Sequence, residues 1–239
     1  MQKIDSVLVF DGIDDYIEIS DSPDFSVATT DQLAVSAWIR PDVLTFPIFE
    51  STGYVHWMGK GDPEQREWVF RMYNEQTTDD PPRPNRISFY VFNLAGGEGI
   101  GSYFQEPVTE GEWIHVVGTA DGKNTTIYKN GNFKDCDQYT GSDPGKCHNY
   151  PPDRWIVPQH GNSPLRIGTR DLQSFFLGAI REVRVWNRAL TVDEVGTLYT
   201  GTIPKDGLVA EYLLQEDVAV DSAGSHVGSI FGATWVANE

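Results

Sequence analysis

Short segments in which apolar and polar residues alternate recur along most of this chain. Residues 33–40 (LAVSAWIR) place Leu33, Val35, Ala37 and Ile39 on one side of an extended backbone, which is the spacing of a β-strand. Further strands are expected at residues 7–10, 16–19, 67–74, 86–93, 113–119, 125–129, 165–168, 179–186, 207–214 and 229–236, with residues 46–57 extended and a turn at 59–62. About a dozen short strands predict an all-β fold of two antiparallel sheets packed face to face, a β-sandwich or jelly roll.

One segment has the pattern of a helix. Thr191 and Glu194 have the spacing of a capping box, in which the two side chains satisfy backbone amides of the first turn. Val195 and Leu198 follow at helical spacing, and Gly201 is a typical stop. We therefore expect one short helix after Thr191.

The first two expected strands flank an acidic turn, residues 11–15 (DGIDD), and are expected to form a hairpin around it. The turn gathers the carboxylates of Asp11, Asp14 and Asp15 at one corner of a sheet. Hard oxygen ligands of this kind hold calcium. Alternatively, the carboxylates only accept hydrogen bonds from the backbone and stabilise the turn.

The strands expected at 67–74 and 86–93 carry large side chains on both faces. On the first strand, Trp68, Phe70 and Met72 share one face. A sheet with one face in water is polar on that face, but the second face of these strands offers Arg71, Tyr73, Tyr90 and Phe92. That face is either a second buried layer or an exposed aromatic platform. A third arrangement puts the platform residues in the sandwich interior and the Trp68 face elsewhere.

Two long loops adjoin these strands. Residues 74–85 are polar and proline-rich, and residues 133–164 form a long irregular segment that holds Tyr150, Trp155 and both cysteines, Cys136 and Cys147. Two cysteines in one loop are best explained by a disulfide, which in entropic models stabilises such a loop by about 3 kcal/mol. A disulfide implies an oxidising compartment. The alternative is two unpaired thiols, and the spacing is not that of a zinc motif.

The charge of the chain narrows the classes of partner. The 18 Lys and Arg residues against 35 Asp and Glu residues give a net charge of −17, which argues against nucleic acid or an anionic membrane. No apolar run approaches the roughly 18 residues of a membrane span. The N-terminal segment MQKIDSVLVF lacks the long apolar core of a signal peptide. The chain is therefore expected to be either intracellular or cut from a larger secreted precursor.

As an ordered set, several segments resemble the laminin-G-like, concanavalin A-like jelly-roll family. They are residues 10–19 (FDGIDDYIEI), 35–41 (VSAWIRP), 59–62 (GKGD), 113–119 (WIHVVGT), 127–131 (IYKNG) and 178–190 (GAIREVRVWNRAL). The resemblance spans residues 7–199 and implies two sheets packed face to face, one of them concave. Residues 207–212 and 232–236 also resemble family segments. We expect 1–239 to form a single domain whose segment 205–239 closes the sandwich beside the N-terminal strands; the alternative is the start of a following repeat.

The resemblance also implies a structural calcium ion near the acidic turn, held by Asp11, Asp14 and Asp15. Relatives add an acidic residue from the segment that is 179–183 here, and many have an aspartate where this chain has Arg181. Our hypothesis is that the Arg181 guanidinium lies among the three carboxylates as a substitute cation, since arginine pairs with carboxylates bidentately.

The residues and the resemblance together favour a non-catalytic recognition module for a polysaccharide or glycoconjugate. Ligand sites combine an aromatic surface with a few polar groups. The expected ligand-binding residues are Arg71, Tyr73, Tyr90 and Phe92 on the face of the sheet, with Tyr150 and Trp155 on the loop at its rim. We expect such a module outside the cell or at its surface, as part of a larger protein.

Two other function classes stay open. A polysaccharide lyase needs a cation, a base and an acid, for which the candidates are Arg71, His56 or His115, and Tyr73 or Tyr90. A retaining hydrolase needs two carboxylates about 5 Å apart, for example Glu67 and a partner across the sheet. The other class is a protein-adhesion or spacer domain, as in laminin G modules and pentraxins.

Overall fold

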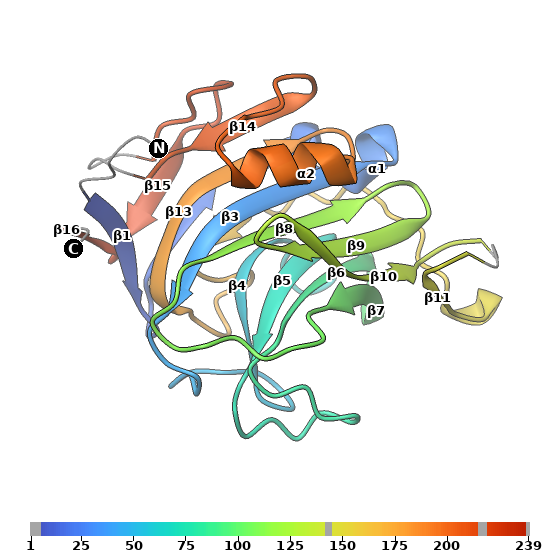
Figure 1. The fold of residues 1–239 in the computed structure, drawn as a ribbon, viewed down its shortest axis with the longest axis horizontal. Helices are drawn as coiled ribbons and strands as arrows, with labels where there is room; N and C mark the ends of the chain where they lie inside the picture. The colour runs from blue at the N-terminus through green and yellow to red at the C-terminus, as the bar shows by residue number, and fades with distance from the viewer. Residues whose placement is uncertain (1–5, 142–144, 215–218, 238–239) are drawn as a thin grey trace.

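Two β-sheets pack face to face with the core between them in this computed structural model (Figure 1), which describes residues 6–141, 145–214 and 219–237. The nine-stranded sheet has the order β11 (His148–Asn149), β10 (Asn132–Gln138), β9 (Asn124–Lys129), β8 (Ile114–Ala120), β3 (Leu33–Pro41), β13 (Leu177–Trp186), β1 (Ser6–Asp11) and β16 (Thr234–Ala237), with β14 (Leu208–Tyr212) also on β13. The seven-stranded sheet has the order β15 (Gly228–Phe231), β2 (Tyr16–Ile19), β12 (Leu165–Ile167), β4 (Tyr54–Lys60), β5 (Trp68–Tyr73), β6 (Ile87–Asn93) and β7 (Gly96–Tyr103). The β-sandwich expected from the sequence is confirmed.

The first two strands do not form the expected hairpin. β1 pairs with β13 and β16 in the nine-stranded sheet, whereas β2 pairs with β12 and β15 in the seven-stranded sheet. The acidic turn between them therefore carries the chain from one sheet to the other. Alternation identifies a strand but not its partner, because either sheet can bury the same apolar face.

The C-terminal strands lie beside the N-terminal ones. β16 pairs with β1, and β15 pairs with β2, where the rings of Tyr16 and Phe231 stack with centroids 4.5 Å apart. The segment 205–239 thus adds strands to both sheets. Residues 215–218 and 238–239 of that segment, and residues 1–5 of the expected domain, lie outside the described residues.

Aromatic side chains fill the interior between the sheets. The ring centroids of Trp57 and Phe70 are 4.6 Å apart, and those of Phe70 and Phe89 are 4.8 Å apart. On β8 of the facing sheet, a Cβ added to Gly118 would lie 2.5 Å from Phe89 and 2.7 Å from Phe70. The glycine therefore makes room for these two rings. Trp68, Phe70 and Met72 all face this core, so the arrangement that put them elsewhere is wrong.

The expected helix is present as α2 (Val192–Tyr199), with a capping box formed by Thr191 and Glu194. Val195 and Leu198 pack on the outer face of the nine-stranded sheet, where they meet Trp186. The described residues also include a one-turn helix α1 (Val27–Thr30) and two short 3₁₀ helices, Pro23–Phe25 and Pro152–Arg154. In the described ranges, no helix has the length and apolar character needed to cross a bilayer.

Three expectations about element boundaries are wrong. The predicted turn at 59–62 begins inside β4, which extends to Lys60, and the loop expected at 133–164 begins later, because β10 continues to Gln138. In these two places tertiary pairing extends a strand through residues that have weak strand patterns. Conversely, most of the segment 46–53, expected to be extended, is not.

Candidate functional site

A group of polar and aromatic side chains lies on the outer face of the seven-stranded sheet, away from the core. The group comes from adjacent strands: Tyr54 and His56 from β4, Arg71 and Tyr73 from β5, and Tyr90 and Phe92 from β6. In the β4–β5 ladder, His56 lies opposite Arg71 and Tyr54 lies opposite Tyr73. Residues opposite each other share a face of the sheet. We call this set the Arg71 face.

Arg71 lies at the centre of this face. Its guanidinium carbon is 4.6 Å from the ring centroid of Tyr54, 4.5 Å from that of Tyr90 and 5.4 Å from that of Phe92. Arg71 and Tyr54 are partly exposed. A cation this close to several aromatic faces is stabilised by their quadrupoles.

A buried histidine holds the guanidinium from below. Arg71 Nε donates to His56 Nε2 at 3.2 Å, and His56 Nδ1 lies 2.7 Å from Glu50 Oε1. An arginine N–H can only donate, so Nε2 of His56 is an acceptor and its proton is on Nδ1, facing Glu50. Burial and the charge of Arg170 lower the pKa of His56, which is therefore neutral. Burial raises the pKa of Glu50, but the contact with His56 outweighs it and the net pKa is lowered.

Glu50, His56 and Asp171 bring three potential metal-ligand atoms within 4.8 Å of one another. A protonated Nδ1 cannot bind a metal, and the Asp171 carboxylate is engaged by the guanidinium of Arg170. Ser174 Oγ also donates to Glu50 at 2.7 Å. These residues therefore form a polar support for Arg71 rather than a metal site.

A second arginine covers the other end of the face. Arg83, from the loop between β5 and β6, lies over the rings of Tyr73 and Tyr103, each 4.9 Å from its guanidinium carbon. It donates to the hydroxyl of Tyr90 at 3.0 Å and forms an ion pair with Asp79. This proline-rich loop thus folds back over the sheet.

Most of the aromatic area is buried. Tyr73 and Phe92 are 1% exposed and Tyr90 is 8% exposed. The rings of Tyr90 and Phe92 lie against β7, where a Cβ on Gly101 or Gly99 would approach them within 2.6 Å. Of the two arrangements expected for this face, the second buried layer is the correct one, and the exposed aromatic platform is wrong. The accessible part is Arg71 and Tyr54.

The rim residues expected from the sequence lie next to this layer. The Tyr150 hydroxyl donates to Asp137 Oδ1 at 3.0 Å, and Trp155 Nε1 donates to the Tyr150 carbonyl at 3.0 Å. A cleft of about 260 Å³ separates this loop from the β6–β7 hairpin. Its lining includes Asn93, Gly97, Gly99, Arg154 and Trp155. Because Gly99 contacts Phe92, the cleft adjoins the Arg71 face.

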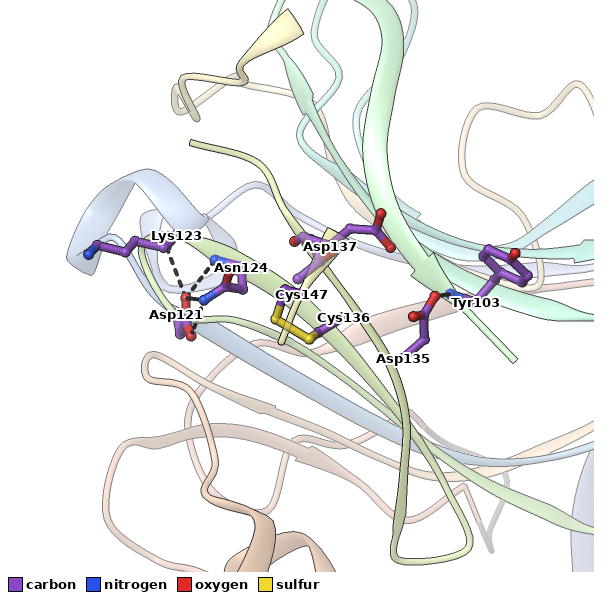
Figure 2. Close-up of a disulfide and its surroundings, with 9 residues drawn as sticks. Tyr103, Asp121, Lys123, Asn124, Asp135, Cys136, Asp137 and Cys147 are labelled. Carbon is purple, nitrogen blue, oxygen red and sulfur yellow. Dashed lines mark hydrogen bonds between the residues drawn. A yellow bond between two sulfur atoms is a disulfide. The ribbon is translucent and has the colours of Figure 1, made fainter. Parts of the chain in front are cut away.

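A disulfide joins Cys136 on β10 to Cys147 in the same loop, as expected from the sequence (Figure 2). Two carboxylates flank Cys136: Asp135 accepts from the backbone amide of Tyr103, and Asp137 accepts from Tyr150. Burial, together with the charge of Asp135, raises the pKa of Asp137 to about 7. The disulfide anchors the start of the rim loop to the sheet.

The acidic turn connects β1 to β2, and in the seven-stranded sheet β12 separates β2 from β4. Asp11 Oδ1 accepts from the amides of Ile13 and Asp14, and Asp15 Oδ2 accepts from the amide of Asp11. Burial raises the pKa of Asp15, and the charges of Asp11 and Asp14 add to this effect. Carboxylate oxygens of the three residues lie within 4.8 Å of one another. Over the described ranges, no basic side chain forms an ion pair with them.

The hypothesis that Arg181 supplies this cation is wrong. Leu177 is the residue of β13 opposite Asp11, and Arg181 lies four residues further, about 13 Å along the strand. Its guanidinium instead lies over the rings of Trp113 and Trp38, at 4.5 Å and 5.3 Å. The alternation along β13 could not reveal this, because the tryptophans come from other strands and loops.

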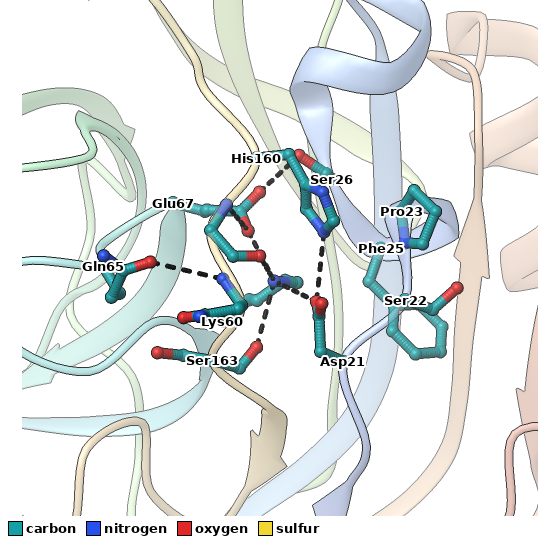
Figure 3. A network of polar contacts seen from close by, with 12 residues as sticks. Asp21, Ser22, Pro23, Phe25, Ser26, Lys60, Gln65, Glu67, His160 and Ser163 are labelled. Carbon is teal, nitrogen blue, oxygen red and sulfur yellow. Dashed lines mark hydrogen bonds and ion pairs between the residues drawn. The ribbon is translucent and has the colours of Figure 1, made fainter.

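The remaining enzyme candidates lie elsewhere. His115 is on the nine-stranded sheet, where burial and the charge of Arg184 lower its pKa to about 3. Glu67 is buried and contacts Lys60 Nζ at 2.5 Å, and the same ammonium lies 2.8 Å from Asp21 (Figure 3). Ser26 donates to the second oxygen of Glu67. The buried ammonium of Lys60 thus pairs with the carboxylates of Asp21 and Glu67, and these ion pairs connect loops to the sheet.

Sequence reasoning missed several residues around Arg71. Tyr54 has a local signal, since it alternates with His56 on β4 and therefore shares its face. Glu50 and Asp171 come from loops distant in sequence, and no spacing connects them with Arg71. Arg83 was included only as part of a polar loop.

Residues 11–196 match the family model described as the concanavalin A-like lectin/glucanases superfamily. Among solved structures, the chain is similar to a Bacteroides ovatus protein provisionally described as carbohydrate-binding (TM-score 0.67, 19% identity, 98% of this chain and 60% of that one). It is also similar to a heptameric SAP-like pentraxin from Limulus polyphemus (TM-score 0.58, 17% identity, 96% of each chain). The ligand-binding domain of botulinum neurotoxin serotype D, solved with N-acetylneuraminic acid, is a third (TM-score 0.52, 14% identity, 78% of this chain and 40% of that one). At these identities the likeness is one of fold, and the chain spans 60% of the length of the Bacteroides protein. No curated protein sequence matches this chain.

Proposed function

The chain belongs to the concanavalin A-like lectin/glucanase superfamily, and from this premise we propose that it is a non-catalytic module that binds carbohydrate at the Arg71 face. The observation that supports this proposal most strongly is that Arg71 and Tyr54 are partly exposed on a sheet face that buried aromatic rings support from below. Sugars offer apolar C–H faces to rings and hydroxyls to polar groups, the mixture that ligand sites provide. Solved structures with this fold include proteins described as binding carbohydrate.

The rim cleft extends this surface. Trp155 and Arg154 line one side and Asn93 the other. An oligosaccharide bound at Arg71 would extend along β6 toward Asn93 to reach the cleft. In this proposal Tyr73 and Phe92 shape the site from below, and the contacts are made by Arg71, Tyr54 and Trp155.

Binding is favoured over elimination chemistry by the state of the polar groups. A lyase needs a free base close to the sugar, but the Nε2 lone pair of His56 already accepts from Arg71. Burial, together with the charge of Tyr90, raises the pKa of Tyr73, which opposes the phenolate form. Neither group is poised to take a proton from a sugar.

A glycan array with purified protein tests this proposal. We expect binding to at least one glycan class, and an affinity loss of about tenfold for Tyr54→Ala, since a stacked ring contributes on the order of 1.4 kcal/mol. Tyr199 is an exposed tyrosine on α2 at the opposite sheet, so Tyr199→Ala is the matched control and should bind normally. Circular dichroism checks folding of both variants. The proposal would be overturned if the folded protein bound no glycan on the array, or if it released unsaturated sugar ends from a polysaccharide.

We also propose that calcium binds at the acidic turn. The donor set of three carboxylates without a paired cation fits a hard divalent ion. Bound there, calcium would supply charge compensation and stabilise the connection between the two sheets. Isothermal titration of chelator-treated protein should show calcium uptake that Asp14→Asn weakens. Uptake that is absent, or unchanged in Asp14→Asn, would contradict this site.

We propose an extracellular or cell-surface location, supported by the disulfide. Thiol titration of protein isolated from its native source should find Cys136 and Cys147 oxidised. Free thiols in that sample would contradict the location.

A further inference from the structure

We propose that the Arg71 face selects sugars that carry a carboxylate, such as uronic or sialic acid residues. This inference rests on the proposed function and specifies the ligand class of the same site. It is carried by the charge and orientation of the Arg71 guanidinium and by the partial exposure of the Arg71 residue.

Arg71 is a cation without a carboxylate partner. Over residues 6–141, 145–214 and 219–237, no Asp or Glu lies within ion-pair distance of its guanidinium. Two nearby arginines do have carboxylate partners: Arg83 pairs with Asp79, and Arg170 pairs with Asp171. A ligand anion would supply the missing partner.

The guanidinium is oriented before any ligand arrives. Its Nε edge is held by His56, whose proton position is set in turn by Glu50. The rings of Tyr54 and Tyr90 lie over the group, and the Tyr73 hydroxyl is a further neutral partner. A guanidinium has five N–H donors, so these partners leave donors on the Nη atoms for a ligand. Preorganisation of this kind reduces the entropy lost on binding.

The remaining N–H donors of Arg71 suit a carboxylate in particular. Two parallel N–H groups of arginine match the two oxygens of a carboxylate, and such charge-assisted pairs are roughly twice as strong as neutral hydrogen bonds. A neutral sugar would offer only hydroxyls to the cation. The partly exposed ring of Tyr54 is then placed to contact the C–H face of the same sugar residue.

Matched ligand pairs test the inference. The probes are sialyllactose against lactose, and oligogalacturonate against its carboxyl-reduced form. We expect the wild-type chain to bind at least one acidic member at least tenfold more tightly than its neutral counterpart, as measured by isothermal titration. Arg71→Gln should remove this preference, and Arg71→Lys, which keeps the charge but loses the two-pronged geometry, should lose most of it.

Arg181→Gln is the control, because Arg181 is also stacked on aromatic rings but lies on the nine-stranded sheet. An equal loss of the preference in Arg181→Gln and Arg71→Gln would overturn the assignment to Arg71. Binding of acidic and neutral members with equal affinity would overturn the carboxylate inference while leaving carbohydrate binding intact. Absence of binding to every glycan, charged or neutral, would instead overturn the proposed function itself.

Discussion

Asp137 shows how burial changes the chemistry of one side chain. It is 4% exposed, lies one residue from Cys136 and accepts a hydrogen bond from Tyr150. In the unfolded chain it ionises near the ordinary pKa of 3.8, whereas in the folded chain it does so near 7. The folded state therefore holds the proton more tightly, and stability falls as the pH rises between these two values.

We predict that Asp137→Asn stabilises the protein at pH 8 and has little effect at pH 3. Asparagine resembles the protonated acid and can still accept from Tyr150. Since one pKa unit corresponds to about 1.4 kcal/mol, the gain at pH 8 should be roughly 1–3 kcal/mol. Urea unfolding at the two pH values measures it. Equal free-energy changes at pH 3 and pH 8 would show that Asp137 is not the titrating group.

Two arginines of this protein, Arg71 and Arg181, differ in how well their positions could be predicted from the sequence. Arg71 and Arg181 both lie against aromatic rings, but alternation assigned only Arg71 to its correct sheet face. The alternation left two arrangements open for the face of Arg71, and the structure selects the buried layer over the exposed platform. Arg181 is expected among the acidic residues of the turn but lies between two tryptophans.

The helix α2 is the element whose local sequence best accounts for its structure. The hydroxyl of Thr191 accepts from the amide of Glu194, and the Glu194 carboxylate accepts from the amide of Thr191. The hydrogen bond from Arg188 lowers the pKa of Glu194 to about 2. The contribution of Glu194 to stability is therefore present above its ordinary pKa of 4.5 and is lost as the pH falls toward 2.

We predict that Glu194→Gln destabilises the protein at pH 7 and much less at pH 2, because only the ionised carboxylate pairs with Arg188 and about half of it is protonated at a pH equal to its folded pKa. The effect at pH 7 should be small, on the order of 0.5–1 kcal/mol, since the pair is partly exposed. Thr191→Ala should cost about 1 kcal/mol at both pH values, since a hydroxyl cap does not titrate. Thermal unfolding of both variants measures this. A Glu194→Gln effect as large at pH 2 as at pH 7 would contradict the ionic origin.

At the scale of the whole molecule, the C-terminal strands extend both sheets. β14 pairs with part of β13, β15 pairs with β2 and β16 pairs with β1. Ala210 and Tyr212 of β14 are fully buried. Without these strands, β1 and β2 would become exposed sheet edges, which favour association with other chains.

We predict that deletion of residues 205–239 lowers the midpoint of thermal unfolding by roughly 10 °C or more, or leaves the chain aggregated. Size-exclusion chromatography and a thermal scan measure the two outcomes. Tyr212→Ala tests the same contacts in the full chain and should cost about 3 kcal/mol. A truncated chain that stays monomeric with an unchanged midpoint would show that this segment is not part of the same folding unit.

Local patterns in the sequence were sufficient to predict most of the secondary-structure elements and the disulfide. Alternation predicted most of the strands, the spacing of Thr191 and Glu194 predicted α2, and two cysteines in one loop predicted the disulfide. These features depend on residues a few positions apart, so a short window contains the interactions that produce them. Family resemblance then gave the two-sheet arrangement.

Tertiary structure alone decided which strands pair and what covers each face. It separated β1 from β2, buried Tyr73 and Phe92, and brought Glu50 and Asp171 from distant loops to His56 beneath Arg71. Such outcomes depend on the free energy of burying whole faces and on contacts between residues far apart in the chain. A local pattern is compatible with several such arrangements, and only the packing of the complete chain selects one.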